Sequence, residues 1–156
     1  MRRTFGTCGA VALVVLGGVF AAAQEQAPKT AKSPTLYQRL GGFDTLAAFF
    51  DDVGPRIFAE PQLSRFFTGH SMDSNLRQRQ RLLELLCAET GGPCTYTGRS
   101  MKTTHAGLGI ADADWNVFYK LLGESLDRIK VKPQEKSELL AIVARYKGDI
   151  VEKQGP

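Results

Sequence analysis

The fold is decided by residues 96–110, which read YTGRSMKTTHAGLGI. This segment carries His105, one of only two histidines in the chain, in a stretch bracketed by glycines between helical patterns. A neutral imidazole is a common metal ligand, and a single imidazole can hold haem iron from one side and leave the opposite side free. His105 is therefore a candidate metal ligand.

On both sides of this segment apolar residues recur at helical spacing, and no stretch alternates convincingly over the length of a strand. The pattern predicts an all-α domain. The first helix is expected from Asp44, with an interruption or bend at Pro55. Two more are expected from Glu60-Pro61 to Thr68-Gly69 and from about Asp73 to Ala88. After the His105 segment, one helix is expected from a cap at Asp112 or Asp114 to about Lys130, and the last from Pro133 to about Ile150.

The N-terminus has the features of an export signal. Met1-Arg2-Arg3 is basic, residues 8–20 are apolar, and Ala21-Ala22-Ala23 supplies the small residues that signal peptidase needs. A membrane anchor is the alternative, but the apolar run is shorter than the roughly 20 residues that span a bilayer. We therefore expect a signal peptide at 1–23, a flexible lead-in at 24–34, a globular domain at 35–152 and a tail at 153–156, in a periplasmic or secreted protein without stable membrane insertion.

Composition narrows the class of partner. The 156 residues are 43% hydrophobic and 23% charged, as for one globular domain with an appendage. Removal of residues 1–23 leaves 18 basic and 16 acidic side chains, a net charge of +2. Without a long basic cluster that is interleaved with aromatic residues, nucleic acid is not expected as the main partner.

Two cysteines remain after the predicted cleavage, Cys87 and Cys94. An exported protein meets an oxidising compartment, so we predict that they form a disulfide. A redox or metal-binding pair is the alternative, although the two residues do not form a C-x-x-C motif.

Four blocks of sequence resemble the group 1 truncated haemoglobins. They are LYQRLGG at 36–42, QLSRFFTG at 62–69, GGPCTYTGR at 91–99 and MKTTHAGLGI at 101–110, and they follow the order of that family. The resemblance extends over nearly all of residues 35–152. It implies a two-over-two helical sandwich around haem b, with His105 as the proximal iron ligand and Phe67 packed against the haem face.

The distal side of the haem departs from the family. The position that commonly holds a tyrosine corresponds to about Gly54, which provides no hydroxyl. Gln80 interrupts an otherwise apolar helical stripe and is the expected substitute, while Gln78 is the alternative because the register is uncertain by about one turn. A glutamine in solvent at the edge of the core is the other interpretation of Gln80.

The remaining candidate haem contacts are of two kinds. The apolar ones are Leu83, Met101, Leu108 and Phe118. Tyr96, Arg99 and Lys102 are expected near the propionates, since charge-assisted bonds suit a carboxylate; the alternative is a solvated loop. His70 could be a sixth iron ligand, but its place in a loop favours a surface role, such as capping the following helix.

Three functional hypotheses follow. The favoured one is a haem protein that reversibly binds a diatomic gas, O2, NO or CO, at iron held by His105. The alternative is an enzyme for nitric oxide dioxygenation or peroxide turnover, which would need an unknown electron donor or a distal acid or base. A haem-free helical interaction module is the third, and the apolar surroundings of His105 argue against it.

Overall fold

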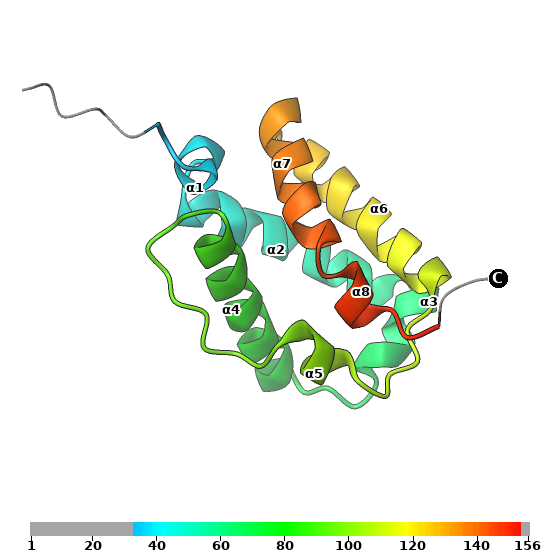
Figure 1. Ribbon diagram of the computed structural model, residues 1–156. Coiled ribbons are helices and arrows are strands. Elements are labelled where there is room, and N and C mark those ends of the chain that lie inside the picture. The colour runs from blue at the N-terminus through cyan, green and yellow to red at the C-terminus, as the bar shows by residue number, and fades with distance from the viewer. Residues whose placement is uncertain (1–32, 154–156) are drawn as a thin grey trace, which may run out of the picture. The chain divides into compact units, whose positions relative to one another are not determined.

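The computed structural model describes residues 33–153. The predicted signal peptide, residues 24–32 of the lead-in and residues 154–156 of the tail lie outside this range. The described residues form helices and no strand: α1 Leu36–Leu40, α2 Phe43–Ala59, α3 Pro61–Ser64, the 3₁₀ helix η1 Arg65–Phe67, α4 Met72–Glu89, α5 Met101–His105, α6 Asp112–Arg128, α7 Pro133–Ala144 and α8 Lys147–Ile150 (Figure 1). None of these helices is long and apolar enough to span a membrane.

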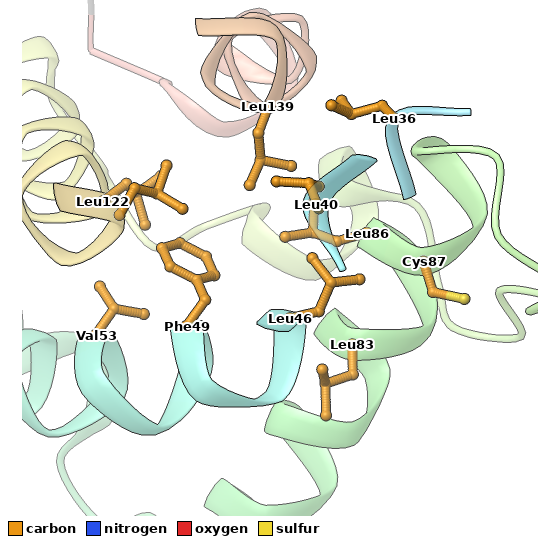
Figure 2. Packing of buried hydrophobic residues seen from close by; sticks show 11 residues of the cluster. Leu36, Leu40, Leu46, Phe49, Val53, Leu83, Leu86, Cys87, Leu122 and Leu139 are labelled. Carbon is orange, nitrogen blue, oxygen red and sulfur yellow. The ribbon is translucent and has the colours of Figure 1, made fainter. Parts of the chain in front are cut away.

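The all-α prediction is confirmed, and the long helices pair as a two-over-two sandwich requires. α2 packs against α4 and α6, and α6 packs against α7. The main core lies among these helices and α1. It comprises Leu36, Leu40, Leu46, Phe49, Val53, Leu83, Leu86, Cys87, Leu122, Leu126 and Leu139 (Figure 2).

A second set of buried apolar side chains lies outside the main core. It consists of Leu63, Leu85, Met101, Ile110, Trp115 and Val151. These residues come from α3, the second half of α4, the segment around His105, the start of α6 and the end of the described chain. Two of these residues, Met101 and Ile110, belong to the His105 segment, which therefore buries apolar side chains outside the main core.

Double glycines end two helices, as the sequence predicts. Gly41 has φ 98° and Gly42 φ 76°, a left-handed backbone that glycine adopts without strain between α1 and α2. After α4, a Cβ on Gly92 would lie 2.7 Å from the sulfur of Cys87. Beside this turn, the Cα atoms of Cys87 in α4 and of Cys94 are 5.6 Å apart and the two sulfurs are at bonding distance. This geometry is compatible with the predicted disulfide.

Pro55 does not interrupt its helix. α2 continues through Pro55 to Ala59, so of the two predicted effects of Pro55, an interruption or a bend, the interruption does not occur. A proline removes one N–H donor and crowds the carbonyl four residues earlier. Because Asp51 and Pro55 are both exposed, that carbonyl can bond to water, while Leu46, Phe49 and Val53 hold the opposite face in the core.

Other helix ends also differ from the prediction. α2 begins at Phe43 with Gly42 at the cap position, and the Ser71 hydroxyl caps α4, which begins at Met72. The predicted last helix is divided between α7 and α8, because Arg145 and Tyr146 donate to carbonyls three residues back in a tighter turn.

Asp114, one of the two predicted capping residues, caps the start of α6 by accepting from the N–H of Ala111 at the N-cap position, and its buried carboxylate also links α6 to α3 and η1. Its carboxylate accepts hydrogen bonds from Gln62 at 3.0 Å, from Arg65 at 2.7 Å and from the Ala111 N–H at 2.9 Å. Burial by itself would raise the pKa of Asp114, but these bonds outweigh burial and lower it. The charged carboxylate therefore stabilises the folded state.

Asp114→Asn is expected to lower the free energy of unfolding by about 2 kcal/mol near neutral pH, because one charged acceptor is lost in a buried network. The pKa is lowered on folding, so this stabilisation is present above the unfolded pKa of about 4 and is lost as the pH falls through the folded pKa. Denaturation curves of both proteins at several pH values should therefore converge on acidification. Asp51→Asn, which removes an exposed pair with Arg79, is the control and should cost less than about 1 kcal/mol. An equal, pH-independent loss in both variants would contradict this role.

Candidate functional site

His105 is the last residue of α5, a single turn of helix. The Ser100 hydroxyl accepts a hydrogen bond from the Thr103 N–H at 3.1 Å and caps the start of this turn. The Nδ1 atom of the His105 ring lies 2.7 Å from the carbonyl oxygen of Met101. A carbonyl only accepts, so Nδ1 carries the hydrogen, and in the neutral ring Nε2 is left with its lone pair available for a metal.

The chain after His105 is built for a tight turn. Gly107 has φ 81° and Gly109 φ 65°, and the Leu108 N–H donates to the His105 carbonyl. Met101 is buried at the start of α5, whereas Leu108 is 44% exposed. The half-buried His105 therefore has an apolar residue on each side along the chain.

Phe67 lies in an aromatic group at the end of η1. The centroid of its ring lies 4.9 Å from that of the Phe58 ring of α2, in an edge-to-face contact, and 5.8 Å from that of the His70 ring. His70 is exposed in the loop before α4. The sequence did not single out Phe58, whose position near the end of α2 and 37% exposure give no local signal of a ring contact.

The structure does not place Gln80 in a pocket. Gln80 is exposed and donates to Glu84 on the same helix. Leu83, on the same stripe, is fully buried in the main core and faces α2, so it serves core packing (Figure 2). The exposure of Gln80 fits the other interpretation of this residue, a glutamine in solvent at the edge of the core.

Gln78, the alternative glutamine, lies in a different environment. It is partly buried, and its Oε1 is a buried atom without a hydrogen-bond partner among the described residues, as is Oδ1 of Asn75 one turn earlier. Gln78, Leu82 and Leu85 share one face at spacings of four and three. Because Leu85 is buried outside the main core, this face turns away from the core that Leu83 joins. The same amide carries two N–H donors, and a half-turn rotation of the amide exchanges the positions of its oxygen and its nitrogen.

The predicted propionate partners differ from one another. Tyr96 donates its hydroxyl hydrogen to the carbonyl of Arg99 at 2.6 Å, so that hydrogen is used within the loop. Burial raises the pKa of Tyr96. Arg99 and Lys102 are exposed and form no ion pair with any described side chain. These two cations remain available for a carboxylate.

Phe118 and Gly54 complete the predicted set. Phe118 of α6 is partly buried, packs against the main core and lies 5.7 Å from the Trp115 ring. A Cβ built on Gly54 would have no heavy atom within 4 Å, so the helix leaves open space where the family commonly has a tyrosine.

The residues present suit a haem. The neighbouring elements offer an imidazole with a free Nε2, exposed apolar side chains at Phe58, Leu76 and Leu108, and an unpartnered buried amide at Gln78. These match the iron, the apolar ring and a polar gas ligand respectively. Two surface cavities of about 180 and 330 Å³ lie elsewhere, and His105 lines neither of them.

Comparisons with known proteins show the family of this chain. The profile of the bacterial-like globin family matches residues 35–152. A group 1 truncated hemoglobin from Mycolicibacterium paratuberculosis is 33% identical over 116 residues, which cover 74% of this chain and 83% of the relative. The chain belongs to the group 1 truncated haemoglobin family. Membership of this globin family implies a haem cofactor.

A second relative supports this truncated haemoglobin assignment, and two solved structures support the fold. The group 1 truncated hemoglobin of Nostoc commune is 32% identical over 119 residues, or 76% of this chain and 98% of the relative. The 2/2 hemoglobin of Synechococcus superposes with a TM-score of 0.69 at 22% identity, covering 77% of this chain and all of that one, 100%. The truncated hemoglobin of Tetrahymena pyriformis, with the same identity and coverage, gives a TM-score of 0.70. The expected two-over-two fold is confirmed.

Proposed function

We propose that this truncated haemoglobin holds haem b through Nε2 of His105 and reversibly binds a diatomic gas, with O2 as the first candidate. The supporting observation is the hydrogen bond between Nδ1 of His105 and the Met101 carbonyl, at 2.7 Å. A metal-ligating histidine usually donates its other ring N–H to such an acceptor, which sets the tautomer and the orientation of the ring.

Each neighbouring side chain has a distinct role in this proposal. Phe67 packs against the ring of the cofactor, and Arg99 and Lys102 pair with its propionates. A haem held on one side by imidazole offers the opposite side of its iron to a small gas. Gln78 donates a hydrogen bond there, in place of the hydroxyl that Gly54 does not supply.

Reversible binding is favoured over peroxide turnover by the position of His70. Peroxide turnover needs a distal acid or base, and nitric oxide dioxygenation needs an electron donor. The His70 ring is exposed and packs edge-on against Phe67. An exposed imidazole in this contact is poorly placed for proton transfer inside a pocket.

The first test is the visible spectrum of the reduced protein before and after addition of carbon monoxide. The wild type should show a Soret band that shifts with carbon monoxide. His105→Gly should lose most of its haem and the associated gain in melting temperature, since a ligand that binds only the folded state stabilises it. Added imidazole should restore the spectrum, and the control His70→Ala should resemble the wild type. Full haem content and an unchanged spectrum in His105→Gly would exclude His105 as the ligand.

The two glutamines provide a matched comparison. Gln78→Leu is expected to speed oxygen dissociation about tenfold, because one hydrogen bond worth about 1 to 1.5 kcal/mol is lost. Gln80→Leu makes the same change on the exposed side of α4 and should leave the rate unchanged. Stopped-flow measurement of oxygen release checks both variants. A larger effect at Gln80 than at Gln78 would reverse the assignment.

We also propose that the protein is exported after cleavage near Ala23 and that Cys87 and Cys94 form a disulfide. Support comes from the leader at 1–23 and from the 5.6 Å between the two Cα atoms. Protein recovered from the periplasm or medium should have a mass that lacks residues 1–23, and its two remaining cysteines should react with an alkylating agent only after reduction. Alkylation of both thiols without reductant would contradict the disulfide.

A further inference from the structure

The turn after His105 is bound by a carboxylate from the far end of the chain. Oε2 of Glu152 accepts a hydrogen bond from the Gly109 N–H at 2.6 Å, and Oε1 accepts one from the Gly107 N–H. Both glycines have positive φ values, 81° and 65°, a conformation that residues with a Cβ rarely adopt. One carboxylate thus binds two amides of the turn that follows the candidate iron ligand.

Backbone bonds attach the same two segments. The N–H groups of Glu152 and Lys153 donate to the Ile110 carbonyl at 2.9 and 3.1 Å, and the Asp112 N–H donates to the Lys153 carbonyl at 3.2 Å. Ala111 and Lys153 form a parallel bridge, and Val151 is buried. These main-chain bonds place the Glu152 side chain over the turn.

We propose that Glu152 is a positioning residue for His105: through its two hydrogen bonds to the 107–109 turn, it sets the direction of the imidazole toward the haem iron. The proposal rests on the proposed role of His105 as the ligand. α5 has only five residues, so the position of its last residue depends on what holds the chain beyond it.

The chemistry requires a carboxylate at this position. An ionised carboxylate only accepts hydrogen bonds, and its two oxygens match the two N–H donors. In Glu152→Gln one oxygen becomes an NH2 group, which would face an N–H donor. The substitution therefore removes at least one bond and adds a donor–donor contact while keeping the size of the side chain.

The test compares Glu152→Gln with Asp149→Asn in the full chain. Asp149 is an exposed acid on α8, so the control makes the same change of charge three residues away. Amide exchange, measured by NMR on the haem-free proteins, reports on the turn itself. Gly107 and Gly109 should exchange at least about tenfold faster in Glu152→Gln, while amides of the α6 core, such as Leu122, should not change.

The holoproteins then report on the imidazole. Haem transfer to excess apomyoglobin should be about tenfold faster from Glu152→Gln than from the wild type or Asp149→Asn, in line with losses of support around metal ligands. The iron–histidine stretching band of the reduced protein, seen by resonance Raman, should shift or broaden in Glu152→Gln alone. A change only in global stability would not move this band.

Three results would overturn the proposal. Unchanged exchange at Gly107 and Gly109 in Glu152→Gln would show that the carboxylate does not hold the turn. Faster exchange with wild-type haem loss and an unshifted band would show that the turn does not direct His105. A His105→Gly variant with a wild-type spectrum would remove the proposed ligand itself, and this failure is distinguishable because the exchange experiment uses no haem.

Discussion

The whole candidate site depends on a histidine at the end of a helix too short to be stable by itself. α5 has five residues, and isolated helices shorter than about 12 residues are marginal in water. Two hydrogen bonds within this turn are local. Ser100 caps its start, and the Met101 carbonyl fixes the tautomer of the His105 ring. After His105 the chain turns through Gly107 and Gly109. The position of the imidazole therefore depends on what holds the chain beyond this turn as well as on these local hydrogen bonds.

Two carboxylates bind backbone amides that follow His105, one from the end of the described chain and one from the first turn of α6. Glu152 binds the amides of Gly107 and Gly109, and Asp114 binds the amide of Ala111. Asp114 also holds Gln62 and Arg65, so it links the His105 segment to the part of the chain that carries Phe67. An irregular segment has backbone donors that no helix satisfies, and charged acceptors satisfy them strongly. The His105 segment and the segment that carries Phe67 are tied together in this way.

The spacing of residues along the sequence predicted which residues share a helix face, but not which of them are buried. Leu76, Gln80, Leu83 and Cys87 do share one stripe of α4, as the spacing predicts, but only Leu83 and Cys87 are buried, whereas Leu76 is 57% exposed. Periodicity identifies a face of a helix, but it does not say how far along that face another element extends. For the same reason the aromatic contact of Phe58 with Phe67 and the reach of Glu152 could not be predicted, since each partner lies on a different element.

By itself the sequence determined the all-α class and the helix breaks at Gly41-Gly42 and Gly91-Gly92, and it made His105 rather than His70 the candidate iron ligand. These depend on nearby residues, through backbone preferences, apolar spacing and the scarcity of imidazole side chains. Only the tertiary structure decided that Gln78 rather than Gln80 is partly buried, that Pro55 is accommodated within α2, and that Asp114 and Glu152 hold the His105 segment. Burial and hydrogen-bond partners are properties of residues brought together by folding, so no local pattern of the chain specifies them.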